Sequence, residues 1–535
     1  MMFDPMEQPF ASNRYCETAL NGMVCTGSYL ASQAGLSILK KGGNAIDAAI
    51  ATAACLTVVE PTSNGLGSDA FAIVWIKNKM YGLNASGYSP RNISLEEIRK
   101  QNPSGKMSKH GWTPVMVPGA VSAWVSLVKR FGRLSLSEDL APAIFYAENG
   151  YAVSPMLGAM WERAAAKYQK LFAGRSEFDE WFRVFTKNGE SYHCGDIVKL
   201  PDHARSLRLI AESEGKEFYE GEIARQFVKQ SAREGGYFSM EDLSSYKPEW
   251  VEPVSIRYRG VDVWELPPNG QGINALMALN ILNSFAFDKR DEKYFHTQLE
   301  AMKMAFADGM HAITDPACMK EDWHAFLKEE YGKQRAMEIG ENAKMPAVRP
   351  SGSGTVYLCT ADKEGNMVSY IQSNYQGFGS GIVVEGYGAA LQNRGADFSL
   401  NEKDANVLAP HKRSYHTIIP GFLTRDGKAL GPFGVMGAYM QPQGHVQVIS
   451  NLIDFHLNPQ MALDAPRWQW IRDKEILVEP DFDPEIIEAL KKRGHLVTIA
   501  KDRVSFGRGE MILRMENGVL IGGTESRTDA GIACW

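Results

Sequence analysis

Apolar residues early in the chain recur at helical spacing. Residues 30–39 place their larger apolar side chains on one helix face, and Gly42-Gly43 supply a C-terminal stop. Asn44 can cap the next run, residues 45–59, which is apolar almost throughout. A helix that is apolar on every face must be buried on most sides. The pattern therefore predicts an amphipathic helix followed by a buried one.

Alternating apolar and polar positions predict strands in several later stretches. Each pair of strand-like segments flanks a short polar or glycine-containing turn, which is typical of β-hairpins. The predicted hairpins are residues 71–75 with 80–83, 254–258 with 261–266, 355–361 with 367–373, 417–423 with 429–435, and 509–515 with 519–523.

Helical spacing dominates between about residues 115 and 345, and later helices are expected at 446–455, 459–465 and 484–492. The chain thus divides into a helix-rich first part and a strand-rich second part. A Ser/Gly run at residues 351–354 joins them.

Composition and charge narrow the class of protein. The chain has 535 residues, 44% hydrophobic and 22% charged, with a formal net charge of -6. This is ordinary globular composition without a basic patch, so we expect no nucleic-acid partner. The seven cysteines are scattered and never form C-x-x-C, which favours reduced thiols and a cytoplasmic location. Neither a signal peptide nor a membrane-spanning segment is expected.

The sequence gives little support for a metal site, a nucleotide-binding loop or a serine catalytic triad. None of the histidines forms H-E-x-x-H, and no histidine pair is expected to have a carboxylate at helical ligand spacing, so we predict no metal site and no cofactor. Residues 377–381 have G-x-G-x-G spacing and precede a strand-like run, which favours a bend between strands over a phosphate loop. No G-x-S-x-G nucleophile elbow occurs.

The junction at Thr355 is a candidate cleavage site, because a flexible run ends there and a strand begins. Cleavage before Thr355 would create an N-terminal threonine with a hydroxyl nucleophile and its own α-amine as base. The turn at residues 434–438 could offer backbone N–H groups to an oxyanion. A threonine at a strand start is often merely structural, since β-branched residues favour strands. Both interpretations stay open from the residues alone.

Long motifs occur in a characteristic order over nearly the whole chain. They include GMVCTGSYLASQAGLSILKKGGNAIDAAIATAACLTVVEPTSNGLGSDAF, VMVPGAVSAW, PPNGQG, GTVYLCTADKEGNMVSYIQSNYQGFGSG, LQNRGADF and NPQMALDAPRW. In this order they resemble the γ-glutamyltranspeptidase (glutathione hydrolase) proenzyme family, in a short-lid branch. The resemblance implies an α/β (α+β) fold, a four-layer αββα sandwich of the N-terminal nucleophile hydrolase type. It also implies self-cleavage into a large subunit, 1–354, and a small subunit, 355–535, that stay paired in one domain.

The resemblance assigns the reaction chemistry to residues of the second part. Thr355 matches the nucleophile, and Ser373 matches the hydroxyl that supports it. Gly437 and Ala438 match the oxyanion-hole residues, which are normally two glycines. An alanine keeps the N–H but adds a Cβ, so the donor survives if its φ is negative.

The resemblance also assigns substrate-binding residues. Asp397 matches the acid that holds the substrate's α-amino group, and Asn393 and Arg394 share its loop. His416 and Thr417 fall where typical members have two serines at the substrate α-carboxylate.

The chain departs from the family pattern close to these residues. The motif LNASGYSP has Tyr88 and its neighbours where the carboxylate-binding arginine is usual, so Arg91 and Arg394 are the nearest replacements. Tyr375 replaces an asparagine that helps to bind the α-amino group. Residues 399–412 are few, so we expect no lid over the site. A lost arginine contact weakens the case for glutathione itself.

The sequence therefore predicts an autoprocessed hydrolase or transferase of γ-glutamyl amides that acts through a threonine acyl-enzyme. Glutaryl-type cephalosporin acylase, poly-γ-glutamate hydrolase and oxamate-type amidohydrolase are alternatives of the same class. An uncleaved, non-catalytic binding protein is the alternative of another class. The expected partner is a small amide substrate, and assembly into a higher oligomer is left open.

Overall fold

Two seven-stranded antiparallel sheets form the centre of the computed structural model, which describes residues 6, 13–346 and 354–535. The first sheet has the order β1 (Glu17–Ala19), β20 (Leu520–Thr524), β19 (Arg508–Arg514), β15 (Lys428–Met436), β14 (Gly421–Arg425), β9 (Val261–Glu265), β8 (Val254–Tyr258). The second has the order β21 (Gly531–Cys534), β2 (Gly22–Thr26), β10 (Val356–Asp362), β11 (Met367–Ser373), β3 (Asp69–Ile76), β4 (Lys79–Ala85), β7 (Glu249–Val251).

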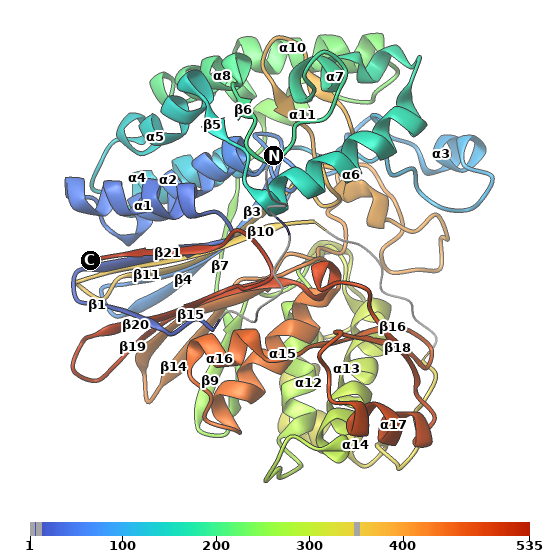
Figure 1. Cartoon of the computed structure of the whole chain (residues 1–535). Helices are drawn as coiled ribbons and strands as arrows, with labels where there is room; N and C mark the ends of the chain where they lie inside the picture. Colours follow the sequence, from blue (N-terminus) through green and yellow to red (C-terminus); the bar gives the residue numbers. More distant parts are fainter. Residues whose placement is uncertain (1–5, 7–12, 347–353) are drawn as a thin grey trace.

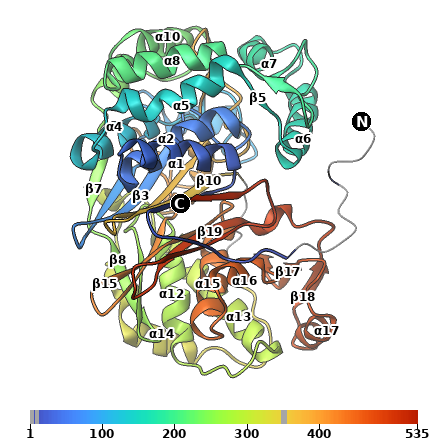
Figure 2. The same cartoon turned by 60° about the vertical axis from the view of Figure 1, so that its left-hand side comes forward.

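Helices cover the outer face of each sheet (Figures 1 and 2). On the side of the second sheet lie α1 (Tyr29–Lys41), α2 (Ala45–Val59), α4 (Ala120–Phe131), α5 (Leu136–Asn149), α6 (Pro155–Phe172), α7 (Asp179–Phe185), α8 (Pro201–Glu212), α9 (Lys216–Tyr219), α10 (Glu222–Arg233) and α11 (Met240–Ser244), with α3 (Leu95–Gln101) at the edge. On the side of the first lie α12 (Gly272–Leu282), α13 (Glu292–Ala312), α14 (Glu329–Ala336), α15 (Met440–Ile453), α16 (Pro459–Asp464) and α17 (Pro484–Lys492).

Apolar side chains from both sheets meet in a shared core. Phe71 and Ile73 from the second sheet belong to one buried cluster with Phe422 and Ile512 from the first. Two larger clusters fill the spaces between each sheet and its helices. This arrangement is the four-layer αββα sandwich predicted from the resemblance, so that prediction is confirmed.

The segments before and after Thr355 are interleaved in both sheets. In the second sheet β10 and β11 lie between β2 and β3, and in the first sheet β9 pairs with β14. A chain cut before Thr355 would therefore keep these ladders as contacts between its two pieces. The order of predicted elements along the sequence suggested a helical part followed by a strand part, but in the tertiary structure the two segments share both sheets.

The buried helix predicted at residues 45–59 is α2, and every one of its residues is buried. Asn44 and Asp47 form a capping box at its start, and the Asp362 carboxylate accepts a further hydrogen bond from the Ala45 N–H at 3.0 Å. The turn between β10 and β11 is thereby fastened to α2. In the described chain, no helix is long and apolar enough to cross a membrane.

All five predicted hairpins are present, with corrected boundaries. β14 begins at Gly421 rather than at residue 417, because residues 415–420 turn through the candidate site. α15 begins at Met440 rather than at residue 446, since its first turns carry buried polar residues that hide the helical pattern.

Some strands were not predicted from the sequence. They are β1, β2 and β21 and the three strands of a small sheet, β16 (Trp468–Arg472), β17 (Glu475–Val478) and β18 (Leu496–Ile499). Two-stranded pairs β5 (Tyr151–Ala152)/β6 (Ile197–Val198) and β12 (Val383–Val384)/β13 (Ala389–Ala390) complete the strands.

Candidate active site

Thr355 lies directly before β10 and is fully buried. The β10–β11 hairpin pairs Val356 with Gln372, so Thr355 comes to lie beside Ser373 at the end of β11. The two hydroxyl oxygens are 3.1 Å apart. Ser373 Oγ also accepts from the Tyr375 N–H at 2.8 Å, which fixes its position. The predicted pairing of these two hydroxyls is therefore built into the hairpin register.

Gly354 precedes Thr355 in a conformation that suits glycine. Its φ is +112°, and a Cβ at this position would lie 2.8 Å from both the Tyr375 carbonyl oxygen and the Gly377 nitrogen. The Gly354 carbonyl oxygen accepts from the Thr355 hydroxyl and lies 3.3 Å from Ser373 Oγ. In this uncut chain the bond at 354–355 is thus surrounded by hydroxyl groups. The predicted flexible run at residues 351–353 lies outside the described residues.

Gly437 and Ala438 form the turn between β15 and α15. Gly437 has a φ of +135° and Ala438 a φ of +51°, so the condition of a negative φ for the alanine is not met. A left-handed alanine retains its N–H donor at a steric cost of about 1–2 kcal/mol. Gln441, in the first turn of α15, places its Nε2 3.5 Å from Thr355 Oγ. The positive end of the α15 dipole therefore lies near the Thr355 hydroxyl.

Gln271 connects this turn to the neighbouring pocket, and sequence reasoning assigned it no role. Its side-chain nitrogen donates to the Ala438 carbonyl at 2.9 Å and to the Thr417 carbonyl at 2.6 Å. Gln271 belongs to the PPNGQG motif, and its place in that motif was the available sequence signal for a role at the site. The side chain is buried. Gln271 and Gln441 are thus additional positioning residues.

A cluster of buried charged and aromatic side chains surrounds the short 3-10 helix η4 (Arg394–Asp397). Arg394 donates through Nη1 to Thr417 Oγ1 at 2.6 Å, and its guanidinium carbon lies 4.1 Å from the centroid of the Tyr375 ring. The Tyr375 hydroxyl donates to Asp397 Oδ1 at 2.5 Å, and Tyr439 approaches the same oxygen at 3.4 Å. We refer to Arg394, Asp397, Tyr375, Thr417 and Tyr439 as the acyl pocket.

Burial shifts the pKa values of the acids at this pocket. It raises the pKa of Asp397 to about 6, although the neighbouring Arg394 charge opposes the shift. Burial likewise raises the pKa of Asp69, which lies 3.9 Å from Arg394 Nε, to about 7. Burial lowers the pKa of His416 well below its usual value, so the imidazole is neutral.

His416 and Asn393 are fully committed to internal hydrogen bonds. His416 Nε2 is 2.9 Å from Asp69 Oδ2, and its Nδ1 accepts from the Ile418 N–H at 3.4 Å. Asn393 accepts from the Gln376 N–H at 3.1 Å and donates to the Lys109 carbonyl at 2.8 Å. Both residues therefore shape the acyl pocket, and their side chains point to protein partners.

Tyr88 and Arg91 belong to other surroundings. The Tyr88 hydroxyl donates to Glu249 at 3.0 Å, and the guanidinium of Arg413 lies over its ring at 4.4 Å. Arg91 pairs with Glu241 on α11 at 3.5 Å. Of the two arginines considered for the missing carboxylate contact, only Arg394 lies in the pocket.

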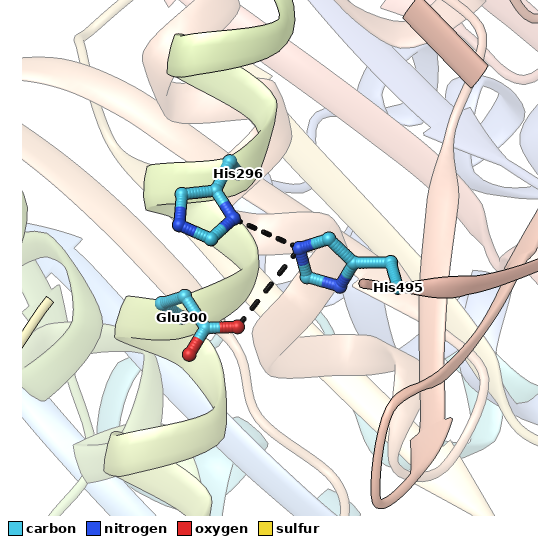
Figure 3. A group of neighbouring side chains, drawn as sticks. All are labelled: His296, Glu300 and His495. Carbon is cyan, nitrogen blue, oxygen red and sulfur yellow. Dashed lines mark hydrogen bonds and ion pairs between the residues drawn. The ribbon is translucent and has the colours of Figure 1, made fainter. Parts of the chain in front are cut away.

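His296, Glu300 and His495 form a separate buried cluster (Figure 3). His296 and Glu300 are four residues apart on α13, so the statement that no histidine pair has a carboxylate at helical spacing is wrong. His296 Nδ1 lies 2.9 Å from His495 Nε2, which lies 4.0 Å from Glu300 Oε1. That same oxygen is 2.7 Å from Lys303 Nζ, so a protein cation already neutralises the carboxylate.

The surroundings of this cluster indicate a structural role. His296 Nε2 lies 2.9 Å from the Gly340 carbonyl, while the Lys344 N–H donates to Glu300 at 3.1 Å. Lys303 also donates to the Lys344 carbonyl. These contacts hold the segment that leads to residue 346 against α13.

An αββα sandwich with a threonine at the start of a central strand defines an N-terminal nucleophile hydrolase. The profile of the gamma-glutamyltranspeptidase family matches residues 31–535. The chain therefore belongs to the γ-glutamyltranspeptidase family of enzymes.

Individual relatives and one solved structure cover 95% or more of the chain. The glutathione hydrolase-like YwrD proenzyme of Bacillus subtilis is 38% identical over 520 residues, 95% of this chain and 97% of the relative. The glutathione hydrolase proenzyme of Escherichia coli is 30% identical, covering 95% and 91%. The crystal structure of a cephalosporin acylase from Bacillus halodurans superimposes with a TM-score of 0.97 at 52% identity, covering 100% of this chain and 99% of that one.

Proposed function

We propose that this protein is a proenzyme that cleaves its own Gly354–Thr355 bond and then hydrolyses or transfers γ-glutamyl-type amides through Thr355. The observation that carries the proposal is the placement of the Thr355 hydroxyl against the Gly354 carbonyl and 3.1 Å from Ser373 Oγ. Two relatives whose names identify them as glutathione hydrolase or glutathione hydrolase-like proenzymes support it.

Self-cleavage follows from this placement. Thr355 Oγ attacks the Gly354 carbonyl carbon, while the Ser373 hydroxyl, 3.3 Å from the carbonyl oxygen, can donate to the developing oxyanion. The C–N bond breaks as the nitrogen takes up a proton, which leaves an ester between Gly354 and the Thr355 oxygen. Water hydrolyses that ester and releases a carboxylate at Gly354 and a free α-amine at Thr355. Subunits 1–354 and 355–535 stay paired through the interleaved sheets.

The cleaved enzyme would use the same hydroxyl on its substrate. The new α-amine takes the proton from Thr355 Oγ, which attacks the amide carbonyl, and the N–H groups of Gly437 and Ala438 stabilise the oxyanion. The amine leaves with the proton, and water or an acceptor amine then releases the acyl group. Arg394, which contacts Thr417 and lies beside Asp397, holds the acyl portion. The seven described cysteines, all free, suit the cytoplasmic location that we propose.

The intact mass of purified protein tests this function. We expect two fragments that separate between Gly354 and Thr355, together with turnover of a chromogenic amide. Thr355→Ala should give one uncut chain without activity, and Thr355→Ser should still be cleaved because it keeps the hydroxyl. An uncut wild-type chain with no turnover would instead support the non-catalytic binding protein.

A further inference from the structure

Arg394 offers an unused bidentate edge inside the acyl pocket. Its Nη1 is occupied by Thr417, whereas Nε and Nη2 have no hydrogen-bond partner among the described residues, although the side chain is only 1% exposed. Nε and Nη2 lie on one edge of a guanidinium, the edge that matches both oxygens of a carboxylate. Buried donors of this kind are costly to leave unpaired. The edge therefore indicates an anionic ligand.

Asp397 is poorly placed to receive an ammonium group. Its Oδ1 already accepts from Tyr375 and is approached by Tyr439. Its Oδ2 has no hydrogen-bond partner among the described residues, but it lies 3.9 Å from Arg394 Nη1. A ligand ammonium at Oδ2 would approach the guanidinium, and like charges repel strongly where water is excluded. Tyr375 thus fills the position at which an amine would bind.

Resting on the proposed function, we propose that this acyl pocket selects monoamides of dicarboxylic acids that carry no α-ammonium group. The distal carboxylate binds the Nε/Nη2 edge of Arg394, and Tyr375 keeps Asp397 from recognising an amine. Arg394 and Tyr375 are then specificity-determining residues for the Thr355 reaction.

A structural role for Arg394 is the competing explanation. Asp69 Oδ2 lies 3.9 Å from Arg394 Nε, beyond hydrogen-bond distance, and Asp69 already pairs with His416 at 2.9 Å. If the edge served only to balance Asp69, replacing Arg394 would affect every acyl group equally. Substrate selectivity distinguishes the two roles.

Three p-nitroanilides that share one leaving group provide the test on the processed wild-type enzyme. γ-Glutamyl carries a carboxylate and an ammonium, glutaryl lacks the ammonium, and butyryl lacks both. We expect kcat/KM for glutaryl to exceed that for γ-glutamyl by about 10-fold and that for butyryl by about 100-fold, as charged bidentate contacts suggest. A preference for γ-glutamyl would overturn the proposal.

Matched variants assign the selectivity to residues. Arg394→Gln should lower kcat/KM for glutaryl by about 10- to 100-fold more than it lowers kcat/KM for butyryl. Tyr375→Phe keeps the ring over Arg394 but frees Asp397 Oδ1, so the ratio of glutaryl to γ-glutamyl should fall about 10-fold. An equal loss for all three substrates in Arg394→Gln would show a structural role only.

The failure of this inference differs from a failure of the proposed function. No cleavage and no turnover of any amide would reject the function. Cleavage and turnover with a preference for γ-glutamyl would reject only the selectivity. If Arg394→Gln does not fold, the wild-type panel and Tyr375→Phe still decide the question.

Discussion

Tyr375 contacts both charges of the acyl pocket: its ring lies 4.1 Å from the guanidinium carbon of Arg394, and its hydroxyl donates to Asp397 at 2.5 Å. Tyr375 is itself held in a left-handed conformation with a φ of +77°. A bulky residue rarely adopts such a φ, and this one directs the phenol toward the acid. The charge state of Asp397 therefore changes the electrostatic potential at the Arg394 guanidinium.

That coupling predicts a pH-dependent selectivity. Burial raises the pKa of Asp397 to about 6, so lowering the pH from about 7.5 to about 5 protonates it while the substrate ammonium stays charged. Protonation removes a negative charge 3.9 Å from Arg394, which favours a carboxylate and disfavours an ammonium. The ratio of kcat/KM for glutaryl over γ-glutamyl should rise about 3- to 10-fold. Asp397→Asn should make this ratio independent of pH, and a flat wild-type ratio would contradict the coupling.

Gly354→Ala should slow self-cleavage by about 10-fold or more, because a Cβ there adds a clash and the φ of +112° disfavours alanine. The time course of fragment appearance after synthesis measures this rate. Gly340→Ala is the matched control, since among the described residues no heavy atom beyond the two chain neighbours lies within 4 Å of its added Cβ. Equal self-cleavage rates in Gly354→Ala and Gly340→Ala would contradict the steric explanation.

Ala438→Gly should retain activity within about 3-fold, since the backbone N–H donor stays in place. It should also raise the melting temperature by about 1–2 °C by relieving the left-handed alanine at a φ of +51°. Ala429→Gly within β15 is the control. This variant should lower the melting temperature, because a glycine weakens a strand. A large loss of activity in Ala438→Gly would mean that the alanine methyl group itself shapes the site.

Asp139 on α5 is buried, and neither carboxylate oxygen has a hydrogen-bond partner among the described residues. Burial, reinforced by Asp47, raises its pKa to about 9. The native state therefore keeps a proton that the unfolded chain releases above about pH 4, so stability falls as the pH rises from there toward about 9.

Asp139→Asn should reduce this pH dependence and stabilise the protein by about 1–3 kcal/mol near pH 8. Melting curves in the uncut Thr355→Ala background would measure it. The exposed Glu516→Gln is the control and should change nothing. An unchanged pH dependence in Asp139→Asn would show that other groups carry it.

The His296, Glu300 and His495 cluster should hold no stoichiometric zinc in the wild type, because the Lys303 ammonium lies 2.7 Å from the Glu300 oxygen. Elemental analysis of purified protein and cleavage in the presence of EDTA would check this. Lys303→Ala removes the competing cation and should bind zinc more tightly than the wild type. One zinc per wild-type chain, lost together with stability on chelation, would contradict the structural role.

Local patterns were sufficient for much of the fold. Hairpin spacing predicted β10 and β11, because register follows from turn length and alternation, whereas the pairing of Thr355 with Ser373 came from the resemblance. The apolar run at residues 45–59 predicted a buried helix, and α2 is buried throughout. Family resemblance added the layer order, which periodicity alone does not carry.

The site required the tertiary structure. Arg91 and Arg394 were equal candidates in the sequence, yet one pairs with Glu241 at the surface and the other is buried at the acyl pocket. The sequence left the φ of Ala438 undecided, and it is +51°. Although Gln271 lies in the PPNGQG motif, the sequence did not predict the contacts of Gln271 and Gln441 with Thr417, Ala438 and Thr355.

By itself the sequence determined where the five hairpins and the buried helix lie, because these depend on propensity and spacing between near neighbours, and its family motifs indicated the candidate nucleophile. Only the tertiary structure decided that the Tyr375 hydroxyl donates to Asp397 and that the Nε/Nη2 edge of Arg394 has no hydrogen-bond partner among the described residues. Those relations depend on side-chain packing among β11, η4 and the turn before α15, where a shift of about 1 Å makes or breaks a hydrogen bond.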